Sequence, residues 1–229
     1  MKRIGLIGGM SWQSTAEYYR LINLGVQERL GGLHSADCVL RSVDFAAVEA
    51  MQVEGRWDDA AVLLAGAAAD LESAGAELVL LCTNTMHKVA PQIEAALTVP
   101  FLHLADATAQ AAVGSGLRRV GLLGTAFTME QDFYRDRLVA HGLEVVVPDA
   151  ADRELVHRVI YDELCLGIVS EESRTAYVDV IGRLVEQGCE GVVLGCTEIE
   201  LLVGQDDSPV PLLATTSLHA AAAVELAVS

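Results

Sequence analysis

Two short segments of the chain place small polar side chains directly after a hydrophobic run. The first reads Leu81-Cys82-Thr83-Asn84-Thr85, and the second reads Leu194-Gly195-Cys196-Thr197-Glu198. A cysteine at a strand end, where a helix begins, lies near free backbone N–H groups that lower a thiol pKa from its usual value of about 8.5. Cys196 is therefore a candidate for thiolate chemistry. The remaining isolated cysteines have the character of inert core side chains: Cys38, Cys165 and Cys189.

The elements that must position these residues alternate along the chain. Short hydrophobic runs predict strands at Arg3–Gly8, Cys38–Val43, Leu78–Cys82, Pro100–Leu104, Arg119–Gly124, Leu143–Val147, Gly191–Gly195 and Val210–Leu213. Amphipathic stretches between them predict helices that include Ser14–Leu30, Trp57–Ala74, Met129–His141 and Ser173–Gln187. This alternation is typical of mainly parallel sheets flanked by helices, so the predicted fold class is α/β.

The chain also repeats itself. Arg3–Gly8 matches Arg119–Gly124 at an offset of 116 (119 − 3), and Gly75–Leu81 matches Gly188–Leu194 at an offset of 113 (188 − 75). Two similar offsets indicate duplication into two pseudo-symmetric domains. We expect the first domain to comprise residues 1–99 with 210–229, and the second residues 100–209. Because ligands bind beyond the carboxyl ends of parallel strands, the active site is expected in the cleft between the domains.

Composition and charge restrict the classes of function. Fifteen basic residues against 32 acidic ones give a net charge of −17, so a nucleic-acid partner is not expected. Ala60–Ala69 is shorter than the ~20 apolar residues of a membrane span. With no signal-peptide pattern, the sequence predicts a cytoplasmic protein without a membrane partner. The cysteines contain no C-x-x-C pair and the histidines form no metal-binding pattern, which predicts neither disulfides nor a metal site.

Three motifs in order resemble the aspartate/glutamate racemases, most closely the branch of L-aspartate/glutamate-specific or broad-specificity amino acid racemases. They are Gly5-Leu-Ile-Gly-Gly-Met-Ser-Trp-Gln-Ser-Thr15, Asn84-Thr85-Met86-His87 and Gly195-Cys196-Thr197-Glu198. The resemblance extends from Ile4 to the C-terminal helix. It implies two related α/β domains, no cofactor, an amino acid substrate, a homodimer, and a pair of residues that act as acid and base across the substrate Cα.

The residue in the first catalytic position departs from the family pattern. The family motif reads Cys-Asn-Thr, whereas here Thr83 precedes Asn84 and the cysteine lies one place earlier. Aligning the internal repeats places Thr83 on Cys196. Matching the two Cys-Thr dipeptides instead would pair Cys82 with Cys196. Because neighbouring strand residues point to opposite faces, only one of these alignments is correct, and we assign Thr83 to the position.

The resemblance and the repeat frame suggest further site residues. Asn84, Thr85 and Thr197 offer hydrogen-bond donors to the α-carboxylate, which stabilises charge as Cα loses its proton. The other predicted substrate-binding residues are Met10, Gln52 and Thr128, with Gln52 and Arg56 placed in a loop after the second strand. Helix capping alone would also explain Thr128 and its neighbour Thr125. His87 could orient a carboxylate or be an ordinary helix residue. The helix dipole alone would explain Glu198.

These features predict a racemase that removes and returns the Cα proton without a cofactor. A threonine hydroxyl is a much poorer base than a thiolate, and the family assigns the second-half cysteine to the L-enantiomer, so a bias for L-amino acids is expected. Aspartate-preferring relatives have a lysine in the stretch that corresponds to Glu163–Gly167, and this chain has none there. In addition, Ala214 stands where the family often has an acidic residue. The alternatives are a dicarboxylate isomerase or decarboxylase of the same superfamily and a non-catalytic protein that binds small anions.

Overall fold

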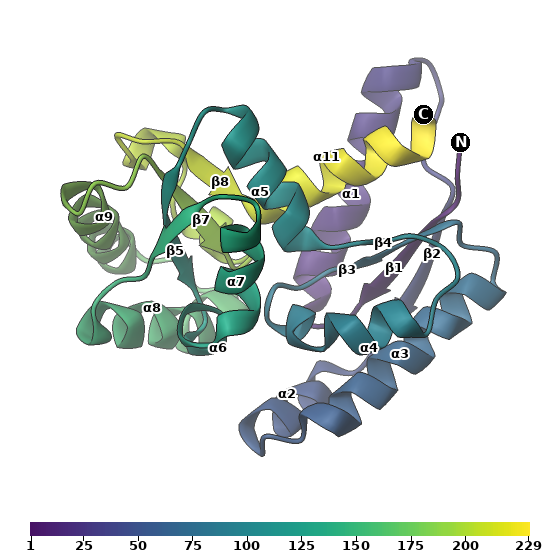
Figure 1. Cartoon of the computed structure of the whole chain (residues 1–229), viewed down its shortest axis with the longest axis horizontal. Coiled ribbons are helices and arrows are strands. Elements are labelled where there is room, and N and C mark those ends of the chain that lie inside the picture. Colours follow the sequence, from purple (N-terminus) through teal and green to yellow (C-terminus); the bar gives the residue numbers. More distant parts are fainter. The chain divides into compact units, whose positions relative to one another are not determined.

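The computed structural model describes all 229 residues and divides them into two compact units (Figure 1). The first unit comprises residues 1–104 and 219–229, and the second comprises residues 105–218. Each unit contains one four-stranded parallel sheet, and the two sheets have equivalent strand orders. The predicted α/β class with two related halves is confirmed.

The first sheet has the strand order β2-β1-β3-β4. Its strands are β1 (Ile4–Gly8), β2 (Cys38–Ser42), β3 (Leu78–Leu81) and β4 (Phe101–Leu102). The helical elements of this unit are α1 (Trp12–Leu30), α2 (Phe45–Val53), α3 (Trp57–Ser73), η1 (Thr85–Val89), α4 (Ala90–Ala95) and the part of α11 (Thr215–Val228) that follows Leu218.

The second sheet has the strand order β6-β5-β7-β8. Its strands are β5 (Arg119–Gly124), β6 (Glu144–Val146), β7 (Gly191–Gly195) and β8 (Leu212–Ala214). The helical elements along this stretch are α5 (Leu104–Gly114), α6 (Ala126–Glu130), α7 (Asp132–Ala140), α8 (Ala150–Asp162), η2 (Leu164–Leu166), α9 (Glu171–Glu186), α10 (Ile199–Leu202) and η3 (Gln205–Asp207).

Alternate residues of the central strands enter different hydrophobic cores. In β3, Leu78 and Leu80 pack with α1 and α11 on one face of the sheet, and Cys82 joins the same core directly after the strand. Val79 and Leu81 pack with α3 on the other face. Burial of a leucine side chain contributes roughly 1.5–3 kcal/mol. Packing against the helices on the two faces therefore determines to which side of the sheet each side chain of β3 points.

The strand pairing reproduces the offsets of the internal repeat. Ile7 pairs with Leu81 between β1 and β3, and Leu123 pairs with Leu194 between β5 and β7. The offset of 116 carries Ile7 onto Leu123, and the offset of 113 carries Leu81 onto Leu194. A shift of one residue would turn every side chain of the strand to the other face of the sheet. The register therefore favours the alignment that places Thr83 on Cys196.

All eight predicted strands are present, with ends that differ by up to two residues from those expected. The helices follow the prediction less closely. The predicted helix Met129–His141 is divided into α6 and α7 because Gln131 adopts an extended conformation, with φ of −99° and ψ of 148°. The loop predicted around Gln52 is wrong, because Phe45–Val53 forms α2, which Asp44 caps by accepting the N–H of Ala46.

The unit boundaries also lie later in the chain than the sequence pattern suggested. They fall after Leu104 and Leu218 rather than after residues 99 and 209. β4 pairs with β3 in the first sheet, and β8 pairs with β7 in the second. A short hydrophobic run looks the same in sequence whichever sheet it joins, so only the pairing determines the division.

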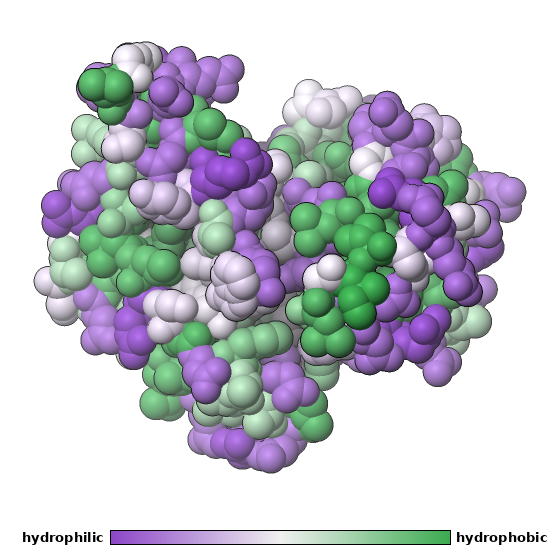
Figure 2. Space-filling view, turned by 180° about the vertical axis from the view of Figure 1, so that it is seen from behind, coloured by the Kyte–Doolittle hydropathy of each residue, from purple (hydrophilic) through white to green (hydrophobic).

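The surface mixes charged residues with separate hydrophobic patches on the face that Figure 2 shows. Over the whole protein, the exposed hydrophobic side chains include Leu33, which is fully exposed, and three that follow α8, namely Leu166, Ile168 and Val169. None of the helices has both the length and the apolar character needed to cross a membrane.

Candidate active site

The turn after β1 brings backbone close to the neighbouring strand. Gly9 has φ of +92°, and a Cβ at this position would lie 2.2 Å from the carbonyl oxygen of Val43. Only glycine fits this conformation and this close approach. The N–H of Gly9 donates a hydrogen bond of 2.9 Å to Oγ1 of Thr15. Met10, which follows, is 4% exposed and packs into the core beside α3, so little of its side chain is available to a ligand.

Cys82 and Thr83 differ in their surroundings, as the strand geometry requires. The Cys82 side chain is completely buried in the core between the sheet and α1 and α11, and burial raises the pKa of its thiol. Its backbone is held as well, since the N–H donates to Ile7 and the carbonyl accepts from Oγ of Ser14. Thr83 is partly exposed at the carboxyl end of the sheet. Of the two residues, only Thr83 has solvent-exposed surface.

The segment after Thr83 is buried, and the ring of His87 ties it to neighbouring backbone. Asn84 and Thr85 are 4% and 6% exposed and begin the turn of η1. The ring of His87 donates from Nδ1 to the carbonyl of Thr83 at 2.7 Å and accepts the N–H of Leu104 at Nε2 at 3.2 Å. Both ring nitrogens are therefore engaged by backbone. With both nitrogens bonded to backbone, His87 holds the turn at Thr83, a role that differs both from orienting a carboxylate and from that of an ordinary helix residue.

Three buried histidines pack together beneath this turn. The ring centroids of His87 and His103 are 4.5 Å apart, and those of His87 and His219 are 6.1 Å apart. Nε2 of His219 donates to the carbonyl of Leu102 at 2.9 Å, so its Nδ1 accepts the hydroxyl of Tyr18 at 2.8 Å. A neutral imidazole satisfies both contacts, with one N–H donor and one acceptor nitrogen. Burial, with a contribution from neighbouring His87, lowers its pKa from 6.5 to about 3.

Neutral His219 makes the protein acid-sensitive. The unfolded chain takes up a proton at this position below about pH 6.5, whereas the folded protein does so only near pH 3. The stabilising contribution is therefore complete above pH 6.5 and is lost as the pH falls toward 3, by up to about 1.4 kcal/mol per pH unit. Urea unfolding of wild type and His219→Gln between pH 7.5 and 4.5 measures this slope. We expect a shallower slope in the variant and no change for exposed His34→Gln; equal slopes for wild type and His219→Gln would contradict the assignment.

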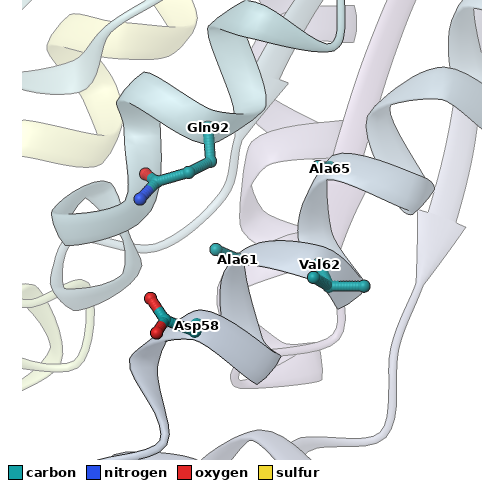
Figure 3. A pocket seen from close by; sticks show the side chains of 5 residues that line it. All are labelled: Asp58, Ala61, Val62, Ala65 and Gln92. Carbon is teal, nitrogen blue, oxygen red and sulfur yellow. The ribbon is translucent and has the colours of Figure 1, made fainter.

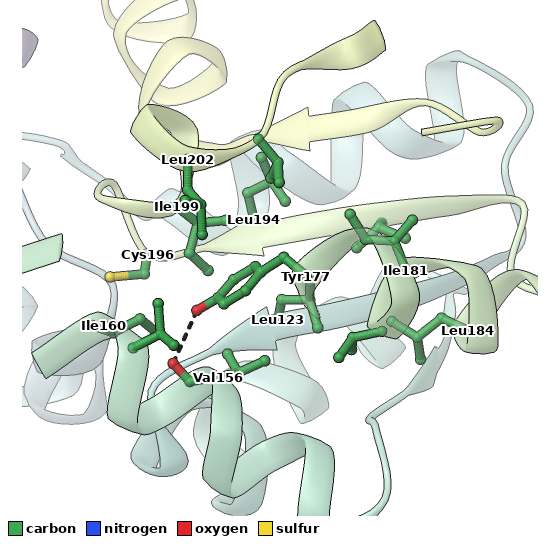
Figure 4. Close-up of a cluster of buried hydrophobic side chains, with 14 of the residues drawn as sticks. Leu123, Val156, Ile160, Tyr177, Ile181, Leu184, Leu194, Cys196, Ile199 and Leu202 are labelled. Atoms are coloured by element: carbon green, nitrogen blue, oxygen red, sulfur yellow. Dashed lines mark hydrogen bonds between the residues drawn. The ribbon is translucent and has the colours of Figure 1, made fainter. Parts of the chain in front are cut away.

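In the second unit, Cys196 follows β7 at the edge of the core formed with α8 and α9. Figure 4 shows it beside Ile199, with its sulfur directed away from the ring of Tyr177. The residue is 9% exposed, and its thiol donates a hydrogen bond of 3.0 Å to Oε2 of Glu198. Tyr177 uses its own hydroxyl to bond the carbonyl of Val156 at 2.9 Å. The side-chain hydrogen bond of the sulfur thus goes to a carboxylate.

The expected lowering of the Cys196 pKa is wrong for this structure. Burial, followed by the charge and hydrogen bond of Glu198, raises the pKa of the thiol well above its usual value, and Cys165 contributes in the same direction. The backbone N–H of Glu198 opposes this shift but does not reverse it. The helix that begins beyond it, α10, has only four residues, so it offers little dipole. Cys196 is accordingly a thiol, not a thiolate, in the unliganded protein.

The two threonines that follow β5 stabilise the local backbone. Oγ1 of Thr125 accepts the N–H of Thr128 at 3.3 Å and caps α6. Thr128 has no exposed surface, and its side chain lies against Gly124 and Gly195, where an added Cβ would come within 3.4 Å of it. Thr128 therefore supports the two strand ends and does not present its hydroxyl to a ligand in this state. Thr197 is partly exposed directly after Cys196.

The remaining predicted residues divide into buried and solvated groups. Gln52 is 5% exposed on α2, where its Nε2 lies 2.9 Å from Sδ of Met86 and its Oε1 is buried without a hydrogen-bond partner. Arg56 is exposed and forms ion pairs with Glu54 and Asp59. Gln52 thus remains a candidate for binding a polar group. Arg56 is instead an ordinary solvent-exposed residue at the start of α3.

A surface depression of ≈ 250 Å³ lies elsewhere in the first unit, between α3 and α4 (Figure 3). Asp58 and Gln92 border it, and its floor consists of small apolar side chains: Ala61, Val62 and Ala65. None of the candidate site residues lines this depression, so it does not extend the site at the strand ends.

Two parallel α/β units with equivalent strand orders, with Thr83 two residues after β3 and Cys196 directly after β7, define a duplicated α/β protein. The chain belongs to the Asp/Glu/hydantoin racemase family, whose model matches residues 7–223. The family resemblance of the three motifs is thereby confirmed.

Solved structures and a curated relative agree with this assignment. A candidate Asp/Glu racemase from Yersinia pestis is 56% identical, with a TM-score of 0.95, and the match covers 100% of both chains. An aspartate racemase homologue from Pyrococcus horikoshii is 34% identical, with a TM-score of 0.86 and 100% coverage of both chains. Glutamate racemase from Streptococcus pyogenes is 29% identical over 128 residues, which are 55% of this chain but only 47% of that protein.

Proposed function

We propose that the protein is a cofactor-independent amino acid racemase in which Cys196 and Thr83 exchange the proton of the substrate Cα. Racemisation requires one proton-transferring group for each face of Cα, and each repeat supplies one at the equivalent position. The Cα–H bond is a very weak acid, so the base must be close, desolvated and correctly oriented. Membership of the racemase family supports this class of reaction.

The observation that carries the proposal is the equivalence of the two positions in the paired strands. Ile7 with Leu81 and Leu123 with Leu194 occupy matching registers, which places Thr83 and Cys196 two residues beyond matching points. Thr83 is partly exposed and Cys196 is 9% exposed, whereas Cys82 is enclosed in the core. The chain therefore offers one thiol and one hydroxyl where a symmetric racemase would offer two thiols.

The neighbouring residues have a role in holding the substrate carboxylate. Thr197 directly follows Cys196, and Asn84 and Thr85 follow Thr83, so their backbone N–H groups lie within two residues of the reacting positions in the chain. Hydrogen bonds to the α-carboxylate stabilise the negative charge that spreads onto it as Cα is deprotonated. We propose Asn84, Thr85 and Thr197 for this role, and Gln52 for contact with the substrate side chain.

Exchange of the α-proton in D₂O, followed by NMR, tests the function directly. We expect the wild-type protein, without added cofactor, to exchange the α-proton of L-Glu, L-Asp or a neutral L-amino acid, with slower formation of the D-enantiomer. Chemical exchange without the protein and with heat-denatured protein provides the background rate. No exchange above background with any amino acid would reject the proposal.

A second candidate function follows from the single thiol of the pair. Isomerisation or decarboxylation of a small dicarboxylate needs one proton-transferring residue at the reacting carbon, and Cys196 alone supplies it. This reaction requires no α-amino group, so succinate-like and malonate-like acids belong in the same substrate panel. Turnover of such an acid with no exchange of amino acids would establish this function in place of racemisation.

A further inference from the structure

The backbone of Thr83 is held by a side chain and not by a strand ladder. β3 ends at Leu81, two residues before it. In an α-helical turn the N–H of His87 would donate to the carbonyl four residues earlier, which is that of Thr83. In η1 it donates instead to the carbonyl of Asn84, at 3.0 Å. The ring of His87 replaces the missing bond, since its Nδ1 donates to the Thr83 carbonyl at 2.7 Å.

The two contacts of the ring determine the tautomer of His87. A backbone carbonyl only accepts hydrogen bonds, and a backbone N–H only donates them. Nδ1, beside the carbonyl of Thr83, therefore carries the ring proton, and Nε2, 3.2 Å from the N–H of Leu104, is the acceptor. The residue is 2% exposed, so both contacts are shielded from water. One rigid ring thus joins the turn at Thr83 to the first residue of α5.

The far side of this bridge is itself fixed. Nε2 of His219 donates to the carbonyl of Leu102 at 2.9 Å, two residues before Leu104, and its Nδ1 bonds the hydroxyl of Tyr18 at 2.8 Å. Tyr18 lies on α1 and His219 on α11, and all of these residues belong to the first unit. His87 therefore attaches the turn to a segment that two helices hold in place.

We propose that His87 is the positioning residue for proton transfer by Thr83. The Thr83 hydroxyl must lie within hydrogen-bond reach of one face of the substrate Cα, and a displacement of about 1 Å can cost roughly 100-fold in rate. By holding the carbonyl of Thr83, the ring sets the position of its backbone and the reach of its hydroxyl. His87 itself neither touches the substrate nor exchanges a proton with it. The inference rests on the proposed function, in which Thr83 serves the D-enantiomer.

Two amide variants each keep one contact of the ring and remove the other. An asparagine amide occupies the position of Nδ1, whereas a glutamine amide reaches the position of Nε2. His87→Asn should therefore keep the hydrogen bond to the Thr83 carbonyl and lose the one to Leu104. His87→Gln should keep the contact with Leu104 and lose the one with Thr83. Both variants lose packing volume at a buried position, so urea unfolding should show that both are destabilised.

Initial rates of α-proton exchange in D₂O, with each pure enantiomer, test the catalytic role. We expect His87→Gln to lower kcat for the D-enantiomer by at least about tenfold, with little change in KM or in the L-rate. His87→Asn should keep the wild-type ratio of L-rate to D-rate. A merely structural role would lower the rates of both enantiomers together, and would do so in both variants.

The same comparison in a Thr83→Cys background gives a larger D-rate to measure. The thiol occupies the position of the hydroxyl, and the backbone carbonyl that His87 holds is unchanged. We expect His87→Gln to lower the D-rate of Thr83→Cys by at least about tenfold as well, because the ring positions the backbone whichever side chain it carries.

The position of Thr83 can also be measured without turnover. NMR order parameters of its backbone N–H should fall in His87→Gln and stay at the wild-type value in His87→Asn. An unchanged order parameter in His87→Gln, an unchanged L-to-D ratio in that variant, or the same loss of D-exchange in both variants would overturn the inference. If the wild type exchanges no amino acid, the proposed racemase is rejected, and the order parameter alone decides whether His87 positions Thr83.

Discussion

Replacing Cys196 with serine should reduce α-proton exchange of an L-amino acid by about a thousandfold, within the range that general acid–base groups contribute. Serine occupies nearly the same volume at this 9% exposed position, so the fold should be retained. Its hydroxyl is far less acidic than a thiol and cannot form an effective base beside the Glu198 carboxylate. Rates from NMR in D₂O, with circular dichroism of both proteins, separate loss of chemistry from loss of structure.

Cys189→Ser provides the control for this experiment. Cys189 is also buried in the second unit, at 3% exposure, but lies before β7 rather than after it. We expect it to exchange substrate at the wild-type rate. If Cys196→Ser kept more than about a tenth of the wild-type rate, the thiol would not be the base, whatever the effect of the control.

A second large effect is expected from the chemical difference between the two positions. Wild-type protein should exchange the α-proton of the L-enantiomer at least about tenfold faster than that of the D-enantiomer, because Thr83 offers a hydroxyl where Cys196 offers a thiol. Thr83→Cys should raise the D-rate and bring the two rates closer together. Initial rates of exchange with each pure enantiomer, extrapolated to zero conversion, test both the preference of the wild type and the change in the Thr83→Cys variant.

Two further variants test whether Thr83 or Cys82 acts in the first catalytic position. Thr83→Ser retains a hydroxyl and should preserve the L-over-D preference. Cys82→Ala removes the thiol that the core encloses and should leave the preference unchanged, at some cost in stability from the small cavity. Equal L- and D-rates in the wild type would exclude Thr83 from the role, and loss of D-exchange in Cys82→Ala alone would transfer the role to Cys82.

The strands were the most predictable part of the fold. Runs such as Arg119–Gly124 and Gly191–Gly195 are hydrophobic, short and bounded by polar residues, and their observed limits are the predicted ones. The helix α2 was missed because its apolar residues are spread around the helix: only Val48 and Gln52 are buried. Without a clear apolar stripe, periodicity cannot identify a helix.

The faces on which Cys82 and Thr83 lie were predictable from the sequence, but the electrostatics around Cys196 were not. The repeat alignment identified which side of the strand Thr83 and Cys82 occupy, because face alternation is a local property of the backbone. The raised pKa of Cys196 could not be anticipated in the same way. It depends on burial and on the rotamer that places Glu198 Oε2 3.0 Å from the sulfur, and both arise from tertiary packing.

The first unit consists of two separate stretches of the chain, residues 1–104 and 219–229, and this has a consequence for synthesis on the ribosome. Its core includes Ala220, Ala223 and Ala227 of α11, and the N–H of Lys2 donates to the carbonyl of Ala227 at 2.8 Å. The second unit is one continuous stretch of chain, residues 105–218. Although domains usually fold in the order of their translation, the first unit here can complete its core only after α11 has been synthesised. The unit whose strands are made first is thus completed only after the whole of the second unit has been synthesised.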